Sequence, residues 1–257
     1  LISIFSRMYT ENKEKEAFRQ LAEIVTEDTT DATIEETIKK PNILKVSDFD
    51  NEVQAEQTVY CTTYYEPHSI SELISMNSEC FGWISIAGTN INYPVLQSHL
   101  DDNLYLDHDI YKNYSFSGSI YSQICNKRDY SDRVTVLYGH NMANGSMFAT
   151  LHRFYDTDFF NKNKYIYVYT PDRKLTYEIV SAFEYDDRHI MNSFDFSDDK
   201  VFSDYLDMIE NPHSVSVNKR NMELTTDDKI LVLSTCLNSG DGRYLVQGVL
   251  KKDEPTK

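Results

Sequence analysis

The stretch LSTCLNSGDGRYLVQGVL, residues 233–250, contains a cysteine and an arginine separated by a short polar loop with two glycines. Cys236 ends the apolar run ILVLSTC, and Arg243 opens the next run, RYLVQGVL. Two apolar runs joined by a glycine-containing turn predict a β-hairpin. In such a hairpin the thiol and the guanidinium lie beside each other. The end of a strand fixes the direction of a side chain and leaves it open to a ligand.

The chemistry of this pair depends on the state of the sulfur. A thiol becomes a strong nucleophile as thiolate, which a nearby cation favours. The residues fit two interpretations equally well: a nucleophilic cysteine beside its cation, or a small core cysteine next to a surface arginine. The other cysteines, Cys61, Cys80 and Cys125, lie in settings that favour structural or incidental roles. No CxxC pair and no Cys/His cluster with zinc spacing occurs, so we expect no metal site. Four cysteines could form two disulfides, but a chain of this length does not need them, so we expect free thiols.

A nucleophilic cysteine needs a group that carries protons, usually a histidine. His140 follows the run RVTVLYG and precedes NMANGSMF, so it also occupies the end of a predicted strand next to a turn. If the strands of His140 and Cys236 run side by side in the same direction, both side chains emerge at one rim of the sheet. His152 is the second candidate, but its helical neighbours indicate packing. The other five histidines lie in polar stretches typical of a surface.

Most of the chain from residue 81 onward consists of apolar or alternating runs separated by turn residues. These runs are FGWISI (81–86), INYPVLQ (91–97), GSIYSQI (118–124), RVTVLYG (133–139), KYIYVYT (164–170), LTYEIVSAFEY (175–185), KILVLSTC (229–236) and RYLVQGVL (243–250). Alternation of this kind predicts β-strands. The 19 tyrosines and 13 phenylalanines also favour strands. Eight strands can close into a small barrel without exposed edges, so the predicted fold is a mainly β, closed eight-stranded barrel.

Helical patterns interrupt or precede the strands. We expect helices at 1–25, at 69–79 with a serine cap, at 146–154, and at 197–210, where one apolar stripe recurs. An acidic, polar connector spans 26–56. The predicted organisation is therefore a helical appendage with its connector (1–68) and a barrel domain (69–257).

The charge excludes one class of function. The chain has 257 residues, with 25 Lys and Arg against 41 Asp and Glu, for a net charge of −16. Such a surface repels phosphate backbones, so we expect no nucleic-acid partner. No apolar run approaches the roughly 20 residues that a membrane-spanning helix needs. Since the chain starts with Leu1 instead of Met, we expect a trimmed or processed form from which an upstream signal or anchor segment has been removed.

Taken together, three separated blocks resemble the sortases, the cysteine transpeptidases of Gram-positive cell surfaces, and class B in particular. LSTC with its loop and arginine resembles the signature around the nucleophile. CFGWISIAGTNINYPVLQSHLDDNLYLDHD (80–109) resembles the first barrel strands, and VTVLYGHNMANGSMFATLHRF (134–154) resembles the segment with the catalytic histidine. The extra helix before the cysteine strand and the N-terminal helical appendage also fit class B. The likeness covers roughly residues 70–250.

This resemblance implies a role for each matching residue. Cys236 is the expected nucleophile, His140 the general acid/base and Arg243 the group that stabilises the oxyanion. Ser234 and Thr235 are expected to line the peptide groove. Asn238 stands where some class B members have an acidic residue, so no Cys-His-Asp triad is predicted.

The resemblance also implies partners and a location. The expected substrates are surface proteins with a C-terminal sorting signal, cleaved after threonine, and the expected acceptor is an amine of the cell wall. The enzyme is expected on the outer face of the cell membrane, held only by an N-terminal anchor, and without cofactor. Three alternatives stay open: a class B enzyme that polymerises pilins through a lysine, a purely hydrolytic cysteine protease, and a binding module whose active site has decayed.

Overall fold

The computed structural model describes residues 70–256 and, ahead of them, Lys13 and Glu16, both helical. The helix expected at 1–25, the connector at 26–56, the boundary between 68 and 69 and Cys61 therefore lie outside the described residues, apart from those two positions. The helices are α2 (Ser71–Met76), η1 (Leu104–Leu106), η2 (Ala149–Tyr155), α3 (Thr157–Lys162), α4 (Ile190–Ser193) and α5 (Asp199–Glu210). The strands are β1 (Cys80–Ser85), β2 (Asn92–Leu96), β3 (Ile120–Tyr121), β4 (Val134–Tyr138), β5 (Tyr165–Tyr169), β6 (Arg173–Tyr185), β7 (Val217–Lys219), β8 (Ile230–Cys236) and β9 (Arg243–Pro255).

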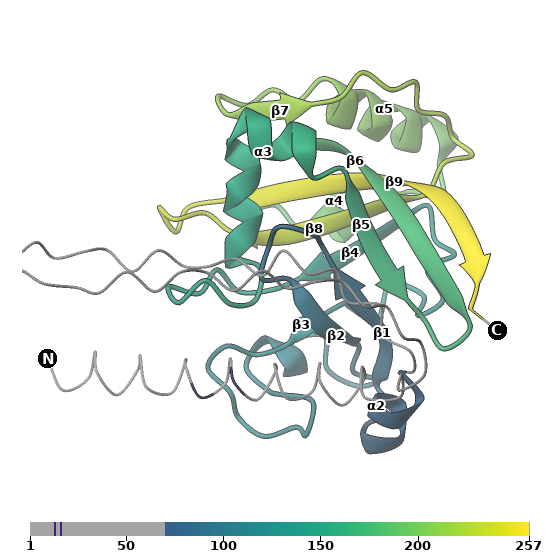
Figure 1. Ribbon diagram of the computed structural model, residues 1–257. Helices are drawn as coiled ribbons and strands as arrows, with labels where there is room; N and C mark the ends of the chain where they lie inside the picture. Colours follow the sequence, from purple (N-terminus) through teal and green to yellow (C-terminus); the bar gives the residue numbers. More distant parts are fainter. Residues whose placement is uncertain (1–12, 14–15, 17–69, 257) are drawn as a thin grey trace, which may run out of the picture.

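Eight of these strands form a closed barrel (Figure 1). The order around it is β5-β1-β2-β3-β4-β8-β9-β6, and β6 pairs again with β5 to close the ring. Closure pairs the backbone of every barrel strand on both sides and so removes exposed edges. All eight predicted strands are present, and the predicted barrel is confirmed. The short β7 was not predicted; it pairs with β6 outside the ring.

Strand alternation sorts the barrel's side chains into two apolar clusters. Leu231 and Leu233 of β8 belong to the inner cluster. Ile230 and Val232 belong to the outer cluster, which also contains the buried face of α5. That face consists of Phe202, Tyr205, Leu206 and Ile209. Figure 1 shows α5 lying on the outside of the barrel next to β6 and β9. The two faces of β8 are therefore both buried, as its continuous apolar run requires.

The helical predictions were correct in part. The predicted helix at 197–210 is α5, which begins after Asp198, whose carboxylate accepts from the backbone N–H groups of Lys200 and Val201. The helix expected at 69–79 is only α2, and its N-cap position, Ile70, has no side-chain cap. The helix expected at 146–154 is the 3₁₀ segment η2, which begins at Ala149 and ends at Tyr155.

None of the helices among the described residues combines the length and the apolar character that a bilayer crossing requires.

Candidate active site

The hairpin between β8 and β9 places Cys236 beside Arg243. The two residues are register partners at the end of the antiparallel pair. The Nη1 atom of Arg243 donates a hydrogen bond to the Sγ atom of Cys236 over 2.8 Å. A permanent cation that donates directly to the sulfur stabilises a thiolate. The prediction that the thiol and the guanidinium face each other is confirmed.

His140 reaches the same rim through a parallel strand pair. β4 pairs parallel with β8, with Tyr138 opposite Ser234, and the N–H of Gly139 donates to the carbonyl of Ser234 over 3.2 Å. Continuing this register by two residues sets His140 opposite Cys236. The condition stated from the sequence, that the two strands run side by side in the same direction, is therefore met.

The side chains of Cys236 and Arg243 both lie on the outer face of the barrel. On β8 the period of two places Cys236 on the same face as Ile230 and Val232, which pack in the outer cluster. On β9, Arg243 shares its face with Leu245, a member of the same cluster. The candidate site therefore lies outside the barrel, at the carboxyl ends of β4 and β8.

Asn141 joins the histidine loop to the cysteine loop. Its Nδ2 atom donates to the carbonyl of Cys236 over 3.2 Å and to Oδ1 of Asn238 over 2.8 Å. The backbone of Asn141 is fixed in turn by a bridge to Met147. Sequence reasoning missed this residue. Its position directly after His140, at the end of a strand, is the only local signal.

His140 itself has a partner from a distant loop. Its Nε2 atom lies 2.8 Å from the carbonyl oxygen of Leu106, which is 34 residues earlier in the chain. Nothing in the sequence pattern indicates this contact.

Aromatic side chains stand next to the candidate site. Tyr121 and Tyr138 are register partners with ring centroids 5.5 Å apart, and Tyr138 lies 6.0 Å from the ring of His189. Burial raises the pKa of Tyr121 to about 12, while the positive charge of Arg243 acts in the opposite direction. That influence places the Tyr121 hydroxyl within electrostatic reach of the guanidinium. Oε1 of Gln123 lies 2.5 Å from Nε2 of His189. None of these four residues was singled out from the sequence.

Ser234 and Thr235 precede the cysteine and are both buried, at 4% and 1% exposure. Ser234 shares the outer face with Cys236, whereas Thr235 shares the inner face with Leu233. The Thr235 hydroxyl has no hydrogen-bond partner within the described part of the chain. Their role in lining a peptide groove stays a prediction.

The second candidate histidine, His152, packs against aromatic rings. It stacks on Tyr155 with centroids 5.7 Å apart and lies 5.1 Å from the ring of Tyr244, whose side chain belongs to the inner cluster. Burial lowers the pKa of His152.

The two other described cysteines are poor nucleophiles. Cys80 is buried, and burial raises its pKa to about 11. Burial of the sulfur, together with the negative charge of Asp102, also raises the pKa of Cys125. Cys80, Cys125 and Cys236 are all free thiols. Of the three, Cys236 is the one whose sulfur accepts a hydrogen bond from a cationic side chain.

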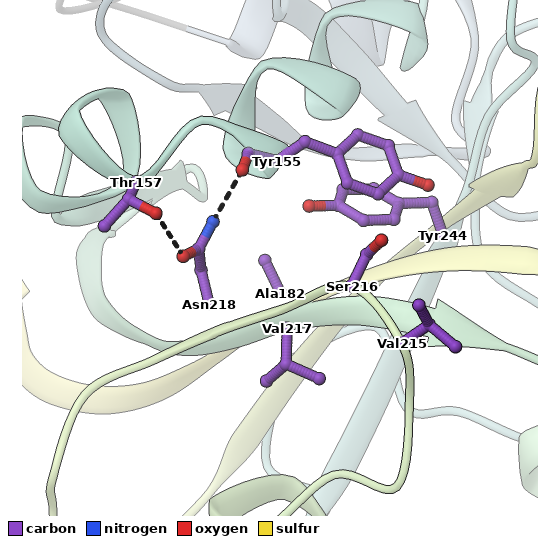
Figure 2. A pocket seen from close by; sticks show the side chains of 8 residues that line it. All are labelled: Tyr155, Thr157, Ala182, Val215, Ser216, Val217, Asn218 and Tyr244. Atoms are coloured by element: carbon purple, nitrogen blue, oxygen red, sulfur yellow. Dashed lines mark hydrogen bonds between the residues drawn. The ribbon is translucent and has the colours of Figure 1, made fainter.

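A cavity of about 340 Å³ lies elsewhere, between the η2–α3 junction and strands β6 and β7. Figure 2 shows Tyr155 and Tyr244 lying over one another at its wall, with Asn218 hydrogen-bonded to Thr157. Cys236, His140 and Arg243 do not line this cavity. Among the described residues, no group of three His, Cys, Asp or Glu side chains is placed to hold a metal ion.

Comparison with known proteins identifies the class of protein to which this chain belongs. The sortase domain family matches residues 84–251, and the chain belongs to the sortase family, which comprises cysteine transpeptidases of the cell surface. The relatives are class B sortases. Sortase B of Listeria monocytogenes is 33% identical over 190 residues, which are 70% of this chain and 73% of the relative.

Solved structures of class B sortases are similar in fold to this chain. The X-ray structure of Clostridium perfringens sortase B matches with a TM-score of 0.65 and 34% identity, over 72% of this chain and 100% of that one. A class B sortase of Streptococcus pyogenes involved in pilus biogenesis matches with a TM-score of 0.61 and 29% identity, over 70% of this chain and 97% of that one.

Proposed function

We propose that the chain is a class B transpeptidase that cleaves a C-terminal sorting signal after threonine and joins the new carboxyl end to an amine of the cell wall. The observation that carries this proposal is the 2.8 Å hydrogen bond from Arg243 to the Cys236 sulfur, at the end of the strand that runs parallel to the one leading to His140. A thiolate, a cation and an imidazole are the groups that acyl transfer through a thioester requires.

In the first half-reaction, Cys236 Sγ attacks the threonine carbonyl carbon. The carbonyl oxygen becomes an oxyanion, which the fork of N–H groups on Arg243 stabilises. The C–N bond breaks as the imidazolium of His140 protonates the departing amine, and a thioester between Cys236 and threonine remains. The released amine is the new N-terminus of the cleaved tail.

In the second half-reaction, an acceptor amine enters and attacks the thioester. His140, now neutral, takes the proton that the amine loses, and Cys236 leaves as thiolate. The product is an amide between the threonine and the acceptor, and the enzyme returns to its starting state. Hydrolysis differs only in that water replaces the amine.

The proposal predicts a covalent intermediate on one sulfur. Incubation with a threonine-containing sorting peptide should give an acyl-enzyme whose added mass equals the N-terminal peptide fragment and maps to Cys236. Cys236→Ala should abolish it. Cys125→Ala, at an exposed thiol, is the matched control and should leave it intact. An acyl group found on Cys125, or product formed by the Cys236→Ala variant, would contradict the assignment.

The same assay separates the alternatives. Adding a short glycine oligomer, as a mimic of a cell-wall amine, should give product joined to that amine. Joining only to a lysine side chain would favour a pilin polymerase, and release of free acid at an unchanged rate in the presence of either amine would indicate a hydrolytic protease. Absence of any acyl-enzyme would favour the binding module.

A further inference from the structure

The contact between His140 and Leu106 constrains the chemistry of the imidazole. A carbonyl oxygen only accepts hydrogen bonds, so the Nε2 atom, 2.8 Å away, must carry the hydrogen. In the neutral ring the other nitrogen, Nδ1, then carries the lone pair. Among the residues that the structure describes, Nδ1 has no hydrogen-bond partner. The carbonyl thus selects one tautomer and leaves one nitrogen free.

The Leu106 carbonyl is held in place by its neighbour Tyr105. The side chain of Tyr105 is 1% exposed, and its hydroxyl donates to Oε2 of Glu79 over 2.6 Å. Its main-chain oxygen accepts from the N–H of Ser119 over 2.9 Å. Tyr105 is the middle residue of the single turn η1, so both of its anchors fix the peptide that follows.

Glu79 anchors this turn from the base of β1. The carboxylate is buried at 6% exposure and accepts from Tyr105, from Nζ of Lys112 at 2.9 Å and from the N–H of His99 at 3.1 Å. Asn77 adds a hydrogen bond to the Tyr105 hydroxyl over 2.7 Å. A buried charge whose partners are all present holds its surroundings rigidly, because losing one partner is costly.

Gly118 packs directly beneath the same carbonyl. Its φ of +57° lies in the left-handed region, and a Cβ there would collide with the carbonyl oxygens of Leu106 and Tyr105. The close approach therefore requires glycine. The turn is clamped between the Glu79 anchor on one side and the Gly118 backbone on the other.

We propose that the η1 turn, anchored by Glu79 and Tyr105, is a positioning device for His140: its Leu106 carbonyl holds Nε2–H and so presents Nδ1 as the nitrogen that exchanges protons with substrate and thiol. This inference rests on the proposed role of His140. Tyr105, Glu79 and Gly118 act through Leu106 and touch no reacting atom. They are positioning residues, as a partner on the far ring nitrogen is in other histidine sites.

The test has a structural readout that needs no turnover. In protein labelled with ¹⁵N-histidine, a two-bond ¹H–¹⁵N spectrum distinguishes the two tautomers, and a His140→Asn variant assigns the signal. At a pH at which the ring is neutral, His140 of the wild-type protein should be the Nε2–H tautomer. In Gly118→Ala, whose Cβ displaces the carbonyl, and in Tyr105→Phe, which removes one anchor and keeps the ring, the signal should shift toward a tautomer mixture.

Kinetic measurements on the same two variants provide the second readout. Acyl-enzyme formation should fall roughly tenfold in kcat with KM unchanged, because ring orientation is lost and peptide binding is not. Gly88→Ala is the matched control: it carries the same left-handed strain at φ +75°, in the β1–β2 turn, and should retain the wild-type tautomer and rate. Thermal unfolding confirms that each variant is folded.

The outcomes are distinct. An Nδ1–H tautomer in the wild type, or an unchanged tautomer and rate in both folded variants, would overturn the positioning role. A wild-type Nε2–H signal without any acyl-enzyme would defeat the proposed function and leave the effect of the turn on the ring standing.

Discussion

At the scale of single residues, the charge beside each sulfur separates the cysteines. Cys236 receives a hydrogen bond from a guanidinium, whereas Cys125 lies within the field of Asp102 and Cys80 lies in the core. A negative neighbour and burial both disfavour a thiolate, and a cation favours it. The identity of the candidate nucleophile therefore follows from its immediate electrostatic surroundings.

Replacing Arg243 by lysine should impair catalysis. Arg243→Lys keeps the charge and loses the fork that can contact the sulfur and a developing oxyanion together. We expect kcat for acyl-enzyme formation to fall by about 10²-fold with the melting temperature unchanged. Arg173→Lys, in a pair with Asp253 at the other end of β6, is the control and should behave as wild type. Normal turnover by Arg243→Lys would remove the oxyanion role.

At the scale of elements, the parallel pairing of β4 with β8 brings two distant segments to one rim. Parallel neighbours end at the same edge of a sheet, so residues just past their last paired positions emerge together. His140 and Cys236 occupy those positions. Asn141 then ties the two loops through the Cys236 carbonyl and the Asn238 side chain.

The effect of Asn141 on the two loops can be measured with a double-mutant cycle between Asn141 and Asn238. Asn141→Ala removes both hydrogen bonds, and we expect kcat/KM for acyl transfer to fall roughly tenfold because the imidazole loop shifts against the thiol loop. Asn238→Ala should lower kcat/KM by a smaller factor. In the double variant the two losses should be less than additive, since the residues share one hydrogen bond. Strict additivity would show that Asn141 and Asn238 act separately.

At the scale of the whole molecule, the buried Glu79 network links acid stability to the loop that carries Leu106. Burial by itself raises the carboxyl pKa. The hydrogen bonds from Tyr105, Lys112 and the His99 N–H outweigh it, so the pKa of Glu79 falls to about 2 from its ordinary value of 4.5. A carboxyl whose pKa is lower in the folded state contributes stability above its unfolded pKa and loses it as the pH falls.

Glu79→Gln should therefore reduce the loss of folding stability at acid pH. Between pH 6 and pH 3 the wild type should lose about 2 kcal/mol more of its free energy of unfolding than the variant does. Urea unfolding of both proteins at the two pH values measures this, and the other carboxylates cancel in the difference. Equal losses would mean that Glu79 keeps an ordinary pKa in the folded state.

Much of the barrel was predictable because strand periodicity is local. Each of the eight runs alternates or is continuously apolar within its own few residues, and the cysteine hairpin needs only a seven-residue separation. Likewise α5 has its cap and its stripe within its own segment. The short β7, the 3₁₀ form of η2 and the turn η1 have no such pattern, because tertiary contacts decide them.

The amino-acid sequence by itself determined the strand content of this protein, the helix before β8, and the proximity of Cys236 to Arg243, since each depends on residues close together in the chain. Only the tertiary structure decided which strands are neighbours, and hence that His140 stands opposite Cys236 and that Leu106 meets the imidazole. The hydrogen bond joins residues 34 positions apart, and the extended strand register brings residues 96 positions apart to one rim. Their geometry depends on barrel closure and register, which the sum of many weak packing interactions sets and no short stretch encodes.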